Sequence, residues 1–431
     1  MSEISIPNPI EKNSPRTITG WAFFDWANSA YALVITVAIF PGYFAAMTPD
    51  KVHIGSFTMS NSTLYSWCIS LGYLIIAFIS PLLSGIADFG GKRKRFMRFF
   101  TLLGALACIS LVFFTSPEKM WVGVIGFILA TIGFAGGIVF YNSYLPLIAT
   151  EDQYDKVSAK GFTYGFVGSV ILLIINLAVI QNAGAFGLSA ITIVPSAFVM
   201  VGLWWLGFSQ IPLNRLPDDR KGDLPKGIMG KGYEELRKVW QVVKRDKNTL
   251  SYLASFFCFN AGVQAVLFLA SIFAEKVLGF DTSHLIYLVL ILQIVAIGGA
   301  ELFARVSGAK GNIWALFVML FIWTGICIAG YFVKTGLDFY ALAAAVGIVM
   351  GGIQSLARST YAKFLPEHTP DTASFFSFYD VMDKLSTVAG TFVFGVVEQL
   401  TGDMRYSVMS LSVFFVMSLV ILRTVKVRRM A

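Results

Sequence analysis

The sequence predicts an all-α polytopic membrane protein. Of its 431 residues, 56% are hydrophobic and only 13% are charged. Its mean hydropathy of +0.71 and this composition lie far outside the range of soluble domains. A helix needs about 20 apolar residues to cross a bilayer, and the chain contains twelve apolar segments long enough to do so. We therefore expect twelve transmembrane helices, with almost no chain left for a soluble domain.

Lysine and arginine set the orientation of these helices, because connections on the cytoplasmic side are enriched in both residues. With a cytoplasmic N-terminus, the cytoplasmic segments hold 27 of the 33 basic residues, and the outer loops hold five. We therefore expect both termini in the cytoplasm. The net charge of +8 is explained by this topology, so no nucleic-acid partner is expected. In chain order, the predicted helices cover residues 19–46, 63–87, 97–116, 121–148, 160–181, 186–209, 250–276, 284–304, 312–333, 339–362, 374–399 and 405–424.

A long polar loop divides the predicted helices into two sets of six. Equal halves indicate an internal duplication, which many transporters use to build two bundles around a central site. The expected order is an N-terminal cytoplasmic tail (1–17), a first bundle (18–210), a basic linker (211–247), a second bundle (248–425) and a cytoplasmic tail (426–431).

The linker contains an amphipathic segment, EELRKVWQVVKRDK. Its apolar residues Leu236, Val239, Trp240 and Val243 recur at helical spacing, opposite charged residues. This pattern predicts a helix on the inner membrane surface. A solvated linker helix without a binding role is an equal alternative.

Asp88 closes the second predicted helix in the stretch SGIADFGGKRKR. The glycine pair after it lets the following basic residues fold back toward a carboxylate or a helix terminus. The stretch resembles the signature between the second and third helices of the major facilitator superfamily, which latches two bundles together on the cytoplasmic side. The resemblance covers Asp88, Gly91, Lys92 and Arg93. In the corresponding later loop, ELFARVSGAK, Arg305 stands in place of an acid, so we expect one latch and not two.

The resemblance extends to further stretches of the chain, among them FFDWANSAYALVITVAIFPGYF, VFYNSYLPLIA, GGIQSLARSTYAKFLP and FFSFYDVMDK. In this order and spacing, they resemble the branch of the superfamily that contains the autophagy-related vacuole effluxers and their bacterial relatives. The resemblance implies the major facilitator fold, with twelve transmembrane helices in two pseudo-symmetric six-helix bundles. It also implies a secondary transporter. Amino acid export is known for the vacuolar members of the branch.

Polar residues within the apolar segments are the candidate site. Asp25 lies about 10 Å into the first helix, at 1.5 Å per residue, and Asn28 shares its face. A carboxylate at this depth costs a few kcal/mol unless it is paired or faces water. Asp25 is therefore a substrate or proton site or, equally, part of a structural ion pair. The seventh helix offers Asn260 and Gln264 as solute ligands, while Ala261 stands where the family often has an acid.

The fourth and tenth helices add further candidates. Tyr141 and Asn142 lie near the end of the fourth helix. We favour hydrogen bonds between packed helices as their role, with substrate binding as the alternative. In the tenth helix, Gln354 is a candidate ligand. Arg358 lies near enough to the inner boundary to snorkel, which is the favoured interpretation. The alternative is a clamp on a substrate carboxylate, which suits the guanidinium fork.

The eleventh helix places Asp380, Asp383 and Lys384 inside an otherwise apolar run. Asp380 and Lys384 are four residues apart with the acid first, which is the favourable order for an ion pair on one helical face. Two alternatives follow. The pair is a fixed bridge, or Lys384 exchanges between Asp380 and Asp25 as the bundles move; exchange is slightly favoured.

Nothing in the sequence predicts an enzyme. The three histidines, His53, His284 and His368, are scattered, and neither a P-loop nor a GxSxG elbow occurs. We therefore expect no catalytic residue, no metal and no cofactor.

The sequence as a whole predicts a secondary active transporter that moves a small polar solute by alternating access. An amino acid is the favoured solute, efflux the favoured direction and a proton the candidate coupling ion. The alternatives are a transporter of sugars, nucleosides or drugs, or a receptor or scaffold that keeps the fold without transport. The expected partners are the small-molecule substrate and the lipid bilayer, and the expected state is a monomer. The favoured location is a bacterial inner membrane, with a vacuolar membrane as the alternative.

Overall fold

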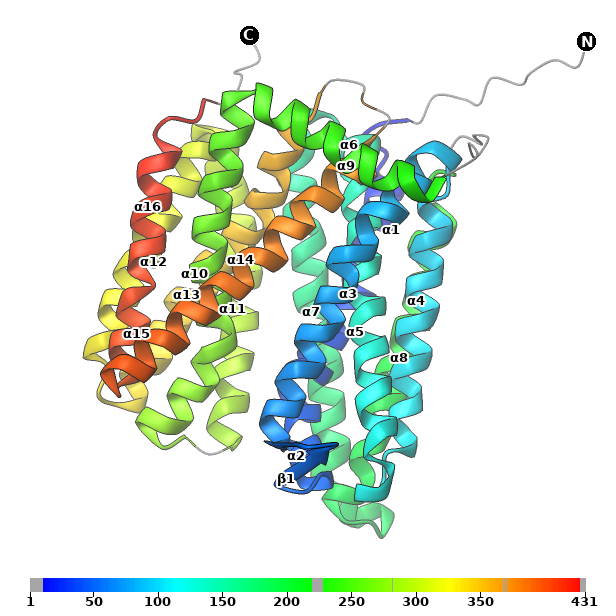
Figure 1. Ribbon diagram of the computed structural model, residues 1–431, viewed down its shortest axis with the longest axis vertical. Helices are drawn as coiled ribbons and strands as arrows, with labels where there is room; N and C mark the ends of the chain where they lie inside the picture. Colours follow the sequence, from blue (N-terminus) through cyan, green and yellow to red (C-terminus); the bar gives the residue numbers. More distant parts are fainter. Residues whose placement is uncertain (1–10, 219–227, 281, 367–368, 370, 427–431) are drawn as a thin grey trace, which may run out of the picture.

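Two bundles of membrane-length helices stand side by side in the structure (Figure 1). The computed structural model describes residues 11–218, 228–280, 282–366, 369 and 371–426. Parts of the expected tails and of the expected linker lie outside these residues, as do His368 and the side chain of Leu236.

The first bundle is formed by the chain up to Arg215. Its membrane-length helices and the short elements between them are α1 (Pro15–Ala30), the π-helix η1 (Tyr31–Ile39), α2 (Phe40–Met47), β1 (Lys51–Ile54), β2 (Phe57–Ser60), α3 (Asn61–Gly90), α4 (Arg93–Ser110), η2 (Leu111–Phe113), η3 (Pro117–Lys119), α5 (Met120–Ser143), α6 (Leu145–Ile148), η4 (Glu151–Gln153), α7 (Tyr154–Gln181), η5 (Ala183–Phe186) and α8 (Ala190–Arg215).

The second bundle follows the linker helix α9 (Ile228–Arg245). Its elements are α10 (Lys247–Leu278), α11 (Thr282–Lys310), α12 (Asn312–Phe332), α13 (Gly336–Lys363), α14 (Thr372–Thr401), α15 (Met404–Ser410) and α16 (Ser412–Leu422). Together the two bundles contain the twelve predicted transmembrane helices, with α1 to α2 and α15 to α16 each forming one interrupted span.

Eleven of these helices are long and apolar enough to cross a membrane by composition alone, among the residues that the structure describes. The twelfth is α14, which interrupts its apolar run with Asp380, Asp383 and Lys384. Its close fit to α10 supports its place in the bundle. A Cβ atom added to Gly390 would lie 2.0 Å from the backbone oxygen of Ala261, so only glycine allows this approach.

The first span contains a π-helical stretch that the sequence did not lead us to expect. The N–H of Phe40 donates to the carbonyl of Ile35, one residue further back than in an α-helix. Pro41 follows directly. Because proline lacks an N–H and its ring clashes with the carbonyl four residues back, it disturbs the regular ladder at this point.

A short hairpin was also missed in the loop before α3. Lys51 to Ile54 pair antiparallel with Phe57 to Ser60, and Ile54 faces Phe57 across a two-residue turn. Gly55 opens the turn at a φ of +61°, a backbone conformation that glycine adopts without strain.

The two bundles meet on two sides. α3 packs against α14 on one side, and α7 packs against α11 and α13 on the other. The first residues of α1 and the last residues of α16 lie at the same end of the molecule, and the hairpin lies at the opposite end (Figure 1). We call the end that holds the start of α1 and the end of α16 the terminal end.

The predicted amphipathic helix is present as α9, which lies across the terminal end (Figure 1). It packs against α3, α14 and α10, so it touches both bundles. Val239 and Val243 are 2% and 1% exposed, and Trp240 stacks on Phe378 of α14 with ring centroids 6.0 Å apart. Protein therefore covers two valines of the apolar face, while Trp240 remains 44% exposed.

Candidate functional site

Arg358 of α13 forms a buried ion pair with the opposite bundle. Its Nη1 lies 3.5 Å from Oδ2 of Asp25 on α1 and donates to Oδ1 of Asn142 on α5 at 3.1 Å. Its Nε donates to Oγ of Ser158 on α7 at 2.9 Å, and its Nη2 donates to the backbone oxygen of the same residue at 2.8 Å. We call these four residues and Tyr141 the cross-bundle cluster.

The favoured prediction that Arg358 snorkels is therefore wrong. Only 4% of Arg358 and 7% of Asp25 are exposed. The guanidinium turns inward because three helices of the first bundle supply acceptors at hydrogen-bonding distance. Asp25, for its part, has the ion-pair partner that a carboxylate at its depth requires.

Aromatic rings enclose the guanidinium of Arg358. Its Cζ lies 4.8, 5.3 and 4.4 Å from the ring centroids of Trp21, Tyr141 and Phe162. Guanidinium is weakly hydrated and binds ring faces, so this setting lowers the cost of its burial. Tyr141 also donates its hydroxyl proton to Oδ2 of Asp25 at 2.7 Å. The ring thus supports both charges of the pair.

Gly161 of α7 makes room for the ion pair. A Cβ atom added to it would lie 2.5 Å from the hydroxyl of Tyr141, and 2.9 Å from both Nη2 of Arg358 and Oδ2 of Asp25. No side chain fits here without moving the charged groups. The position is therefore fixed by the close approach of α7 to the cluster.

A second polar cluster lies between α14 and α10. Nζ of Lys384 is 3.2 Å from Oδ1 of Asp380 and 2.7 Å from Oδ2 of Asp383. The other carboxylate oxygen of Asp383 accepts from Nδ2 of Asn260 at 2.7 Å and from Nε2 of Gln264 at 3.5 Å. The structure thus brings together five residues that the sequence analysis named on two separate helices, and we call these five residues the α14 cluster.

Lys384 does not reach Asp25 in this structure. Its ammonium group binds the two acids of its own helix and lies 4.9 Å from the ring centroid of Tyr73 on α3. Asp25 instead pairs with Arg358. In this structure Arg358 is therefore the partner of Asp25 across the bundles, and the exchange of Lys384 between Asp380 and Asp25 stays a prediction.

The predicted latch joins α3 to the start of α14. Asp88 binds Arg93 at 2.5 Å and accepts hydrogen bonds from the N–H groups of Ala373 and Ser374, at 3.2 and 2.8 Å. A carboxylate at this position satisfies free N–H groups and complements the positive end of the helix dipole. Gly91 turns the chain at a φ of +57°.

Lys92 contributes to this turn through its backbone, since its N–H donates to the carbonyl of Ala87 at 3.1 Å. The next basic residue, Lys94, extends the contact with Nζ 2.9 Å from Asp218 in the linker.

A second contact of the same kind occurs, so the expectation of a single latch is wrong. Asp155, in the first turn of α7, accepts from Oγ of Ser307 at 2.6 Å and from Nδ2 of Asn312 at 2.7 Å, on either side of the α11 to α12 turn. Lys363 of α13 completes it at 2.8 Å. In the first contact the acid is Asp88, which lies near the α3 to α4 turn and binds the start of α14. In the second contact the acid is Asp155, which lies at the start of α7 and binds the α11 to α12 turn. Arg305 is exposed and binds Glu301 of its own helix.

Asn28 and Gln354 join neither cluster through any hydrogen bond among the described residues. Asn28 is 1% exposed, and both polar atoms of its amide lack a partner within the described chain. A buried amide without partners is costly. Asn28 therefore remains a candidate contact for a solute.

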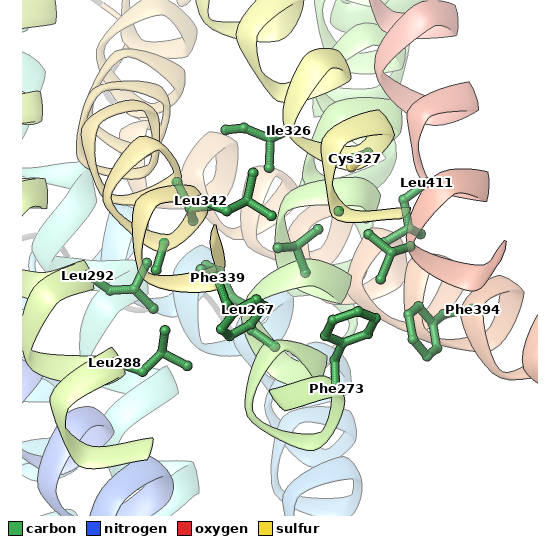
Figure 2. Close-up of a pocket in the computed structure, with 16 residues that line it drawn as sticks. Leu267, Phe273, Leu288, Leu292, Ile326, Cys327, Phe339, Leu342, Phe394 and Leu411 are labelled. Carbon is green, nitrogen blue, oxygen red and sulfur yellow. The ribbon is translucent and has the colours of Figure 1, made fainter. Parts of the chain in front are cut away.

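An apolar cavity of about 50 Å³ lies within the second bundle (Figure 2). Of the side chains that line it, only that of Cys327 carries a heteroatom. Without a polar side chain to bind a charged group, this cavity does not suit a polar solute. The polar clusters are better candidates for the functional site.

Sequence reasoning missed Ser158, Asp155 and Asn312. Each contributes only after folding, because its partner lies in the other bundle or beyond a turn. One signal was present, since Asp155 is an acid in the first turn of a helix, where a carboxylate is favourable.

Comparisons with known proteins match this chain over most of its length. A profile of the family described as "Vacuole effluxer Atg22 like" matches residues 13–431. The MFS-type transporter YxiO of Bacillus subtilis is 30% identical, with 93% of each chain covered. Autophagy-related protein 22 of Kluyveromyces lactis is 25% identical, with 86% of this chain and 80% of the relative covered.

Solved structures agree with the fold. The transporter FucP of the major facilitator superfamily, in its outward conformation, superposes with a TM-score of 0.72. The match covers 95% of this chain and 98% of FucP at 15% identity. At this level of identity, the similarity concerns the fold alone.

Proposed function

The chain belongs to the Atg22-like vacuole effluxer family of the major facilitator superfamily, and we propose that, as a transporter and not an enzyme, it moves a small polar solute by alternating access. We propose an amino acid as the solute and efflux as the direction. The effluxer description of the family supports the direction, and the pairing of Asp25 with Arg358 supports the amino acid. We further propose proton coupling.

The observation that carries this proposal is the buried ion pair between Asp25 and Arg358. The two residues belong to different bundles, so the terminal end opens only if the pair separates. Separation leaves two buried charges unpaired, which is costly unless each finds a new partner. An amino acid brings one carboxylate for Arg358 and one ammonium for Asp25, so it can replace both partners at once.

We propose that the terminal end faces the cytoplasm. The support is the excess of lysine and arginine in the segments at that end. With this orientation, both inter-bundle latches close the cytoplasmic side. We favour a bacterial inner membrane, since YxiO of Bacillus subtilis covers this chain almost end to end; the Atg22 relatives keep a vacuolar membrane as the alternative. We propose a monomer as the transporting unit.

The test combines binding with transport. Purified protein is screened for thermal stabilisation by single amino acids, sugars, nucleosides and drugs, and each stabilising compound is then assayed for uptake into proteoliposomes. We expect at least one amino acid to stabilise and to be transported. The double variant Asp25→Asn with Arg358→Gln should lose both effects.

The exposed pair Glu301 and Arg305 supplies the control. Glu301→Gln with Arg305→Gln should keep both stabilisation and transport. Stabilisation only by sugars, nucleosides or drugs would refute the amino acid assignment. Stabilisation without any transport would point instead to a receptor or scaffold.

A further inference from the structure

The α14 cluster carries a net charge of minus one when both of its carboxylates are ionised. Asp380 and Asp383 face a single ammonium group, that of Lys384. In the cross-bundle cluster, by contrast, one carboxylate faces one guanidinium. An unbalanced charge at membrane depth is energetically unfavourable. The excess in the α14 cluster therefore favours the binding of one further cation.

The contacts within the cluster identify the atom where this cation would bind. Asp383 uses both carboxylate oxygens, one for Lys384 and the other for Asn260 and Gln264. Asp380 uses only Oδ1, for the longer contact to Lys384. Its Oδ2 is buried and has no hydrogen-bond partner among the residues that the structure describes, and Asp380 as a whole is only 5% exposed.

The surroundings of Asp380 suit a proton better than a larger cation. A metal ion or a substrate ammonium needs several acceptor atoms around it. A proton needs one oxygen, and the cluster leaves one. No group of three or more acidic, histidine or cysteine side chains suited to a metal ion occurs in the described part of the chain.

Few other groups that titrate lie near Asp380. On its own helix these are Asp383 and Lys384, and from α3 there is Tyr73, whose ring lies beside the ammonium of Lys384. α10 contributes only the amides of Asn260 and Gln264 to the cluster, and these do not titrate.

The remaining neighbours of α14 include α15, whose Arg405 donates to the backbone oxygens of Tyr331 and Val333. Others contact Phe378 and Tyr379, the two residues directly before Asp380. α9 reaches it through Trp240, which stacks on Phe378, and α13 through Tyr361, which stacks on Tyr379. In α5, Tyr141 is the one residue with a titratable side chain, and it is engaged with Asp25 in the cross-bundle cluster.

We propose that Asp380 is the residue that binds the coupling proton, at Oδ2, while Asp383, Lys384 and Asn260 form a permanent scaffold around it. This inference rests on the proposed transport function and names the ion and the atom. The proton adds to the free carboxylate oxygen and forms a carboxylic acid, which brings the cluster to zero net charge. Its release to solvent restores the carboxylate.

A readout that does not depend on transport tests the protonation itself. Infrared difference spectra of the purified protein, taken between neutral and alkaline buffer so that exposed carboxylates stay ionised in both, should show a carboxylic acid band in the wild type. The band should be absent in Asp380→Asn and weakened in Asp383→Asn, because the second variant leaves Asp380 and Lys384 as a balanced pair. Glu301→Gln, which removes an exposed acid paired four residues away on its own helix, is the matched control and should keep the band.

Transport gives the second readout. In proteoliposomes, an imposed proton gradient should stimulate uptake of radiolabelled amino acids by the wild type and by Glu301→Gln. Asp380→Asn should lose the stimulation, and Asp380→Glu, which retains a carboxyl group, should keep it together with a shifted band. Survival of the band or of the stimulation in Asp380→Asn would overturn the inference. A wild type that shows the band but no transport would refute the proposed function and leave the proton site standing.

Discussion

At the scale of the residue, Arg358 shows how a buried charge is accommodated. Its guanidinium donates to a carboxylate, an amide oxygen, a hydroxyl and a backbone oxygen, all from the first bundle. Trp21, Tyr141 and Phe162 surround the same group. Each acceptor lies on a helix other than α13, so the position of Arg358 depends on the contact between the bundles.

Loss of one partner of this pair should cost more than loss of both. Asp25→Asn leaves a buried guanidinium without its counter-charge, and we expect a loss of about 3–5 kcal/mol in the free energy of unfolding. Asp25→Asn with Arg358→Gln should recover most of that loss. Unfolding in mixed detergent micelles measures both. The exposed control pair, Glu301→Gln with Arg305→Gln, should change stability by no more than about 1 kcal/mol. An Asp25→Asn variant no less stable than this control would contradict the account.

Gly161 provides a steric test of the same cluster. Gly161→Ala inserts a methyl group between Tyr141, Arg358 and Asp25, and overpacking of this kind costs about 1–3 kcal/mol. We expect lower thermal stability and weaker transport. Gly207→Ala is the matched control, because a Cβ atom on Gly207 would meet nothing within 4 Å. Equal behaviour of the two variants would show that the cluster tolerates the added volume.

At this scale, the sequence identified the residues better than their partners. The depth of Asp25 in an apolar run was enough to require a partner or water. The sequence did not identify Arg358 as that partner, because the two residues are 333 positions apart and meet only when the bundles pack. The snorkelling rule failed for the same reason, since it assumes that lipid and headgroups surround the residue, whereas Arg358 is surrounded by protein.

At the scale of the element, helix starts carry the two contacts between the bundles. Asp88 binds the first N–H groups of α14, and Asp155 in the first turn of α7 binds Ser307 and Asn312. The two helices occupy equivalent places in the two bundles, as the fifth and eleventh spans. The contacts are thus related by the internal pseudo-symmetry, with the acid on opposite sides.

Removal of either acid should loosen the helix start or turn that it binds. We expect Asp88→Asn to raise amide hydrogen exchange in the first turn of α14, and Asp155→Asn to raise it in the α11 to α12 turn. Mass spectrometry of the exchanged protein measures both segments in one experiment. Each variant serves as the control for the other, because its effect should be confined to its own contact. If neither variant changes exchange at its own segment, these acids do not hold the terminal end closed.

The transmembrane elements were predictable because apolar length alone decides whether a helix can span a bilayer. The interruptions within them were harder to predict. The π-helix before Pro41 depends on how the backbone hydrogen bonds of the first span rearrange around the proline. The hairpin before α3 depends on a two-residue turn that begins at Gly55. The amphipathic helix was predicted, but its surroundings were not, because the pattern does not distinguish lipid from the flank of α3.

At the scale of the whole molecule, three polar inter-bundle contacts require the two bundles to be together at the terminal end. The cross-bundle cluster and both latches join the first bundle to α13, α14 or the α11 to α12 turn. The structure is therefore closed there, and solute access from that side requires the bundles to separate. The two-bundle architecture was predictable from the equal halves of the sequence, whereas this closed state was not.

The distance between the bundles at the terminal end tests this account most directly. Arg95 at the start of α4 and Ala309 at the end of α11 are exposed and belong to different bundles. Cysteines at these two positions, in a protein without its four native cysteines, carry spin labels for pulsed dipolar spectroscopy. We predict one short distance for the otherwise unchanged protein, and an additional longer one when Asp25→Asn and Arg358→Gln are introduced. The same single distance in both proteins would contradict the claim that the pair holds the terminal end closed.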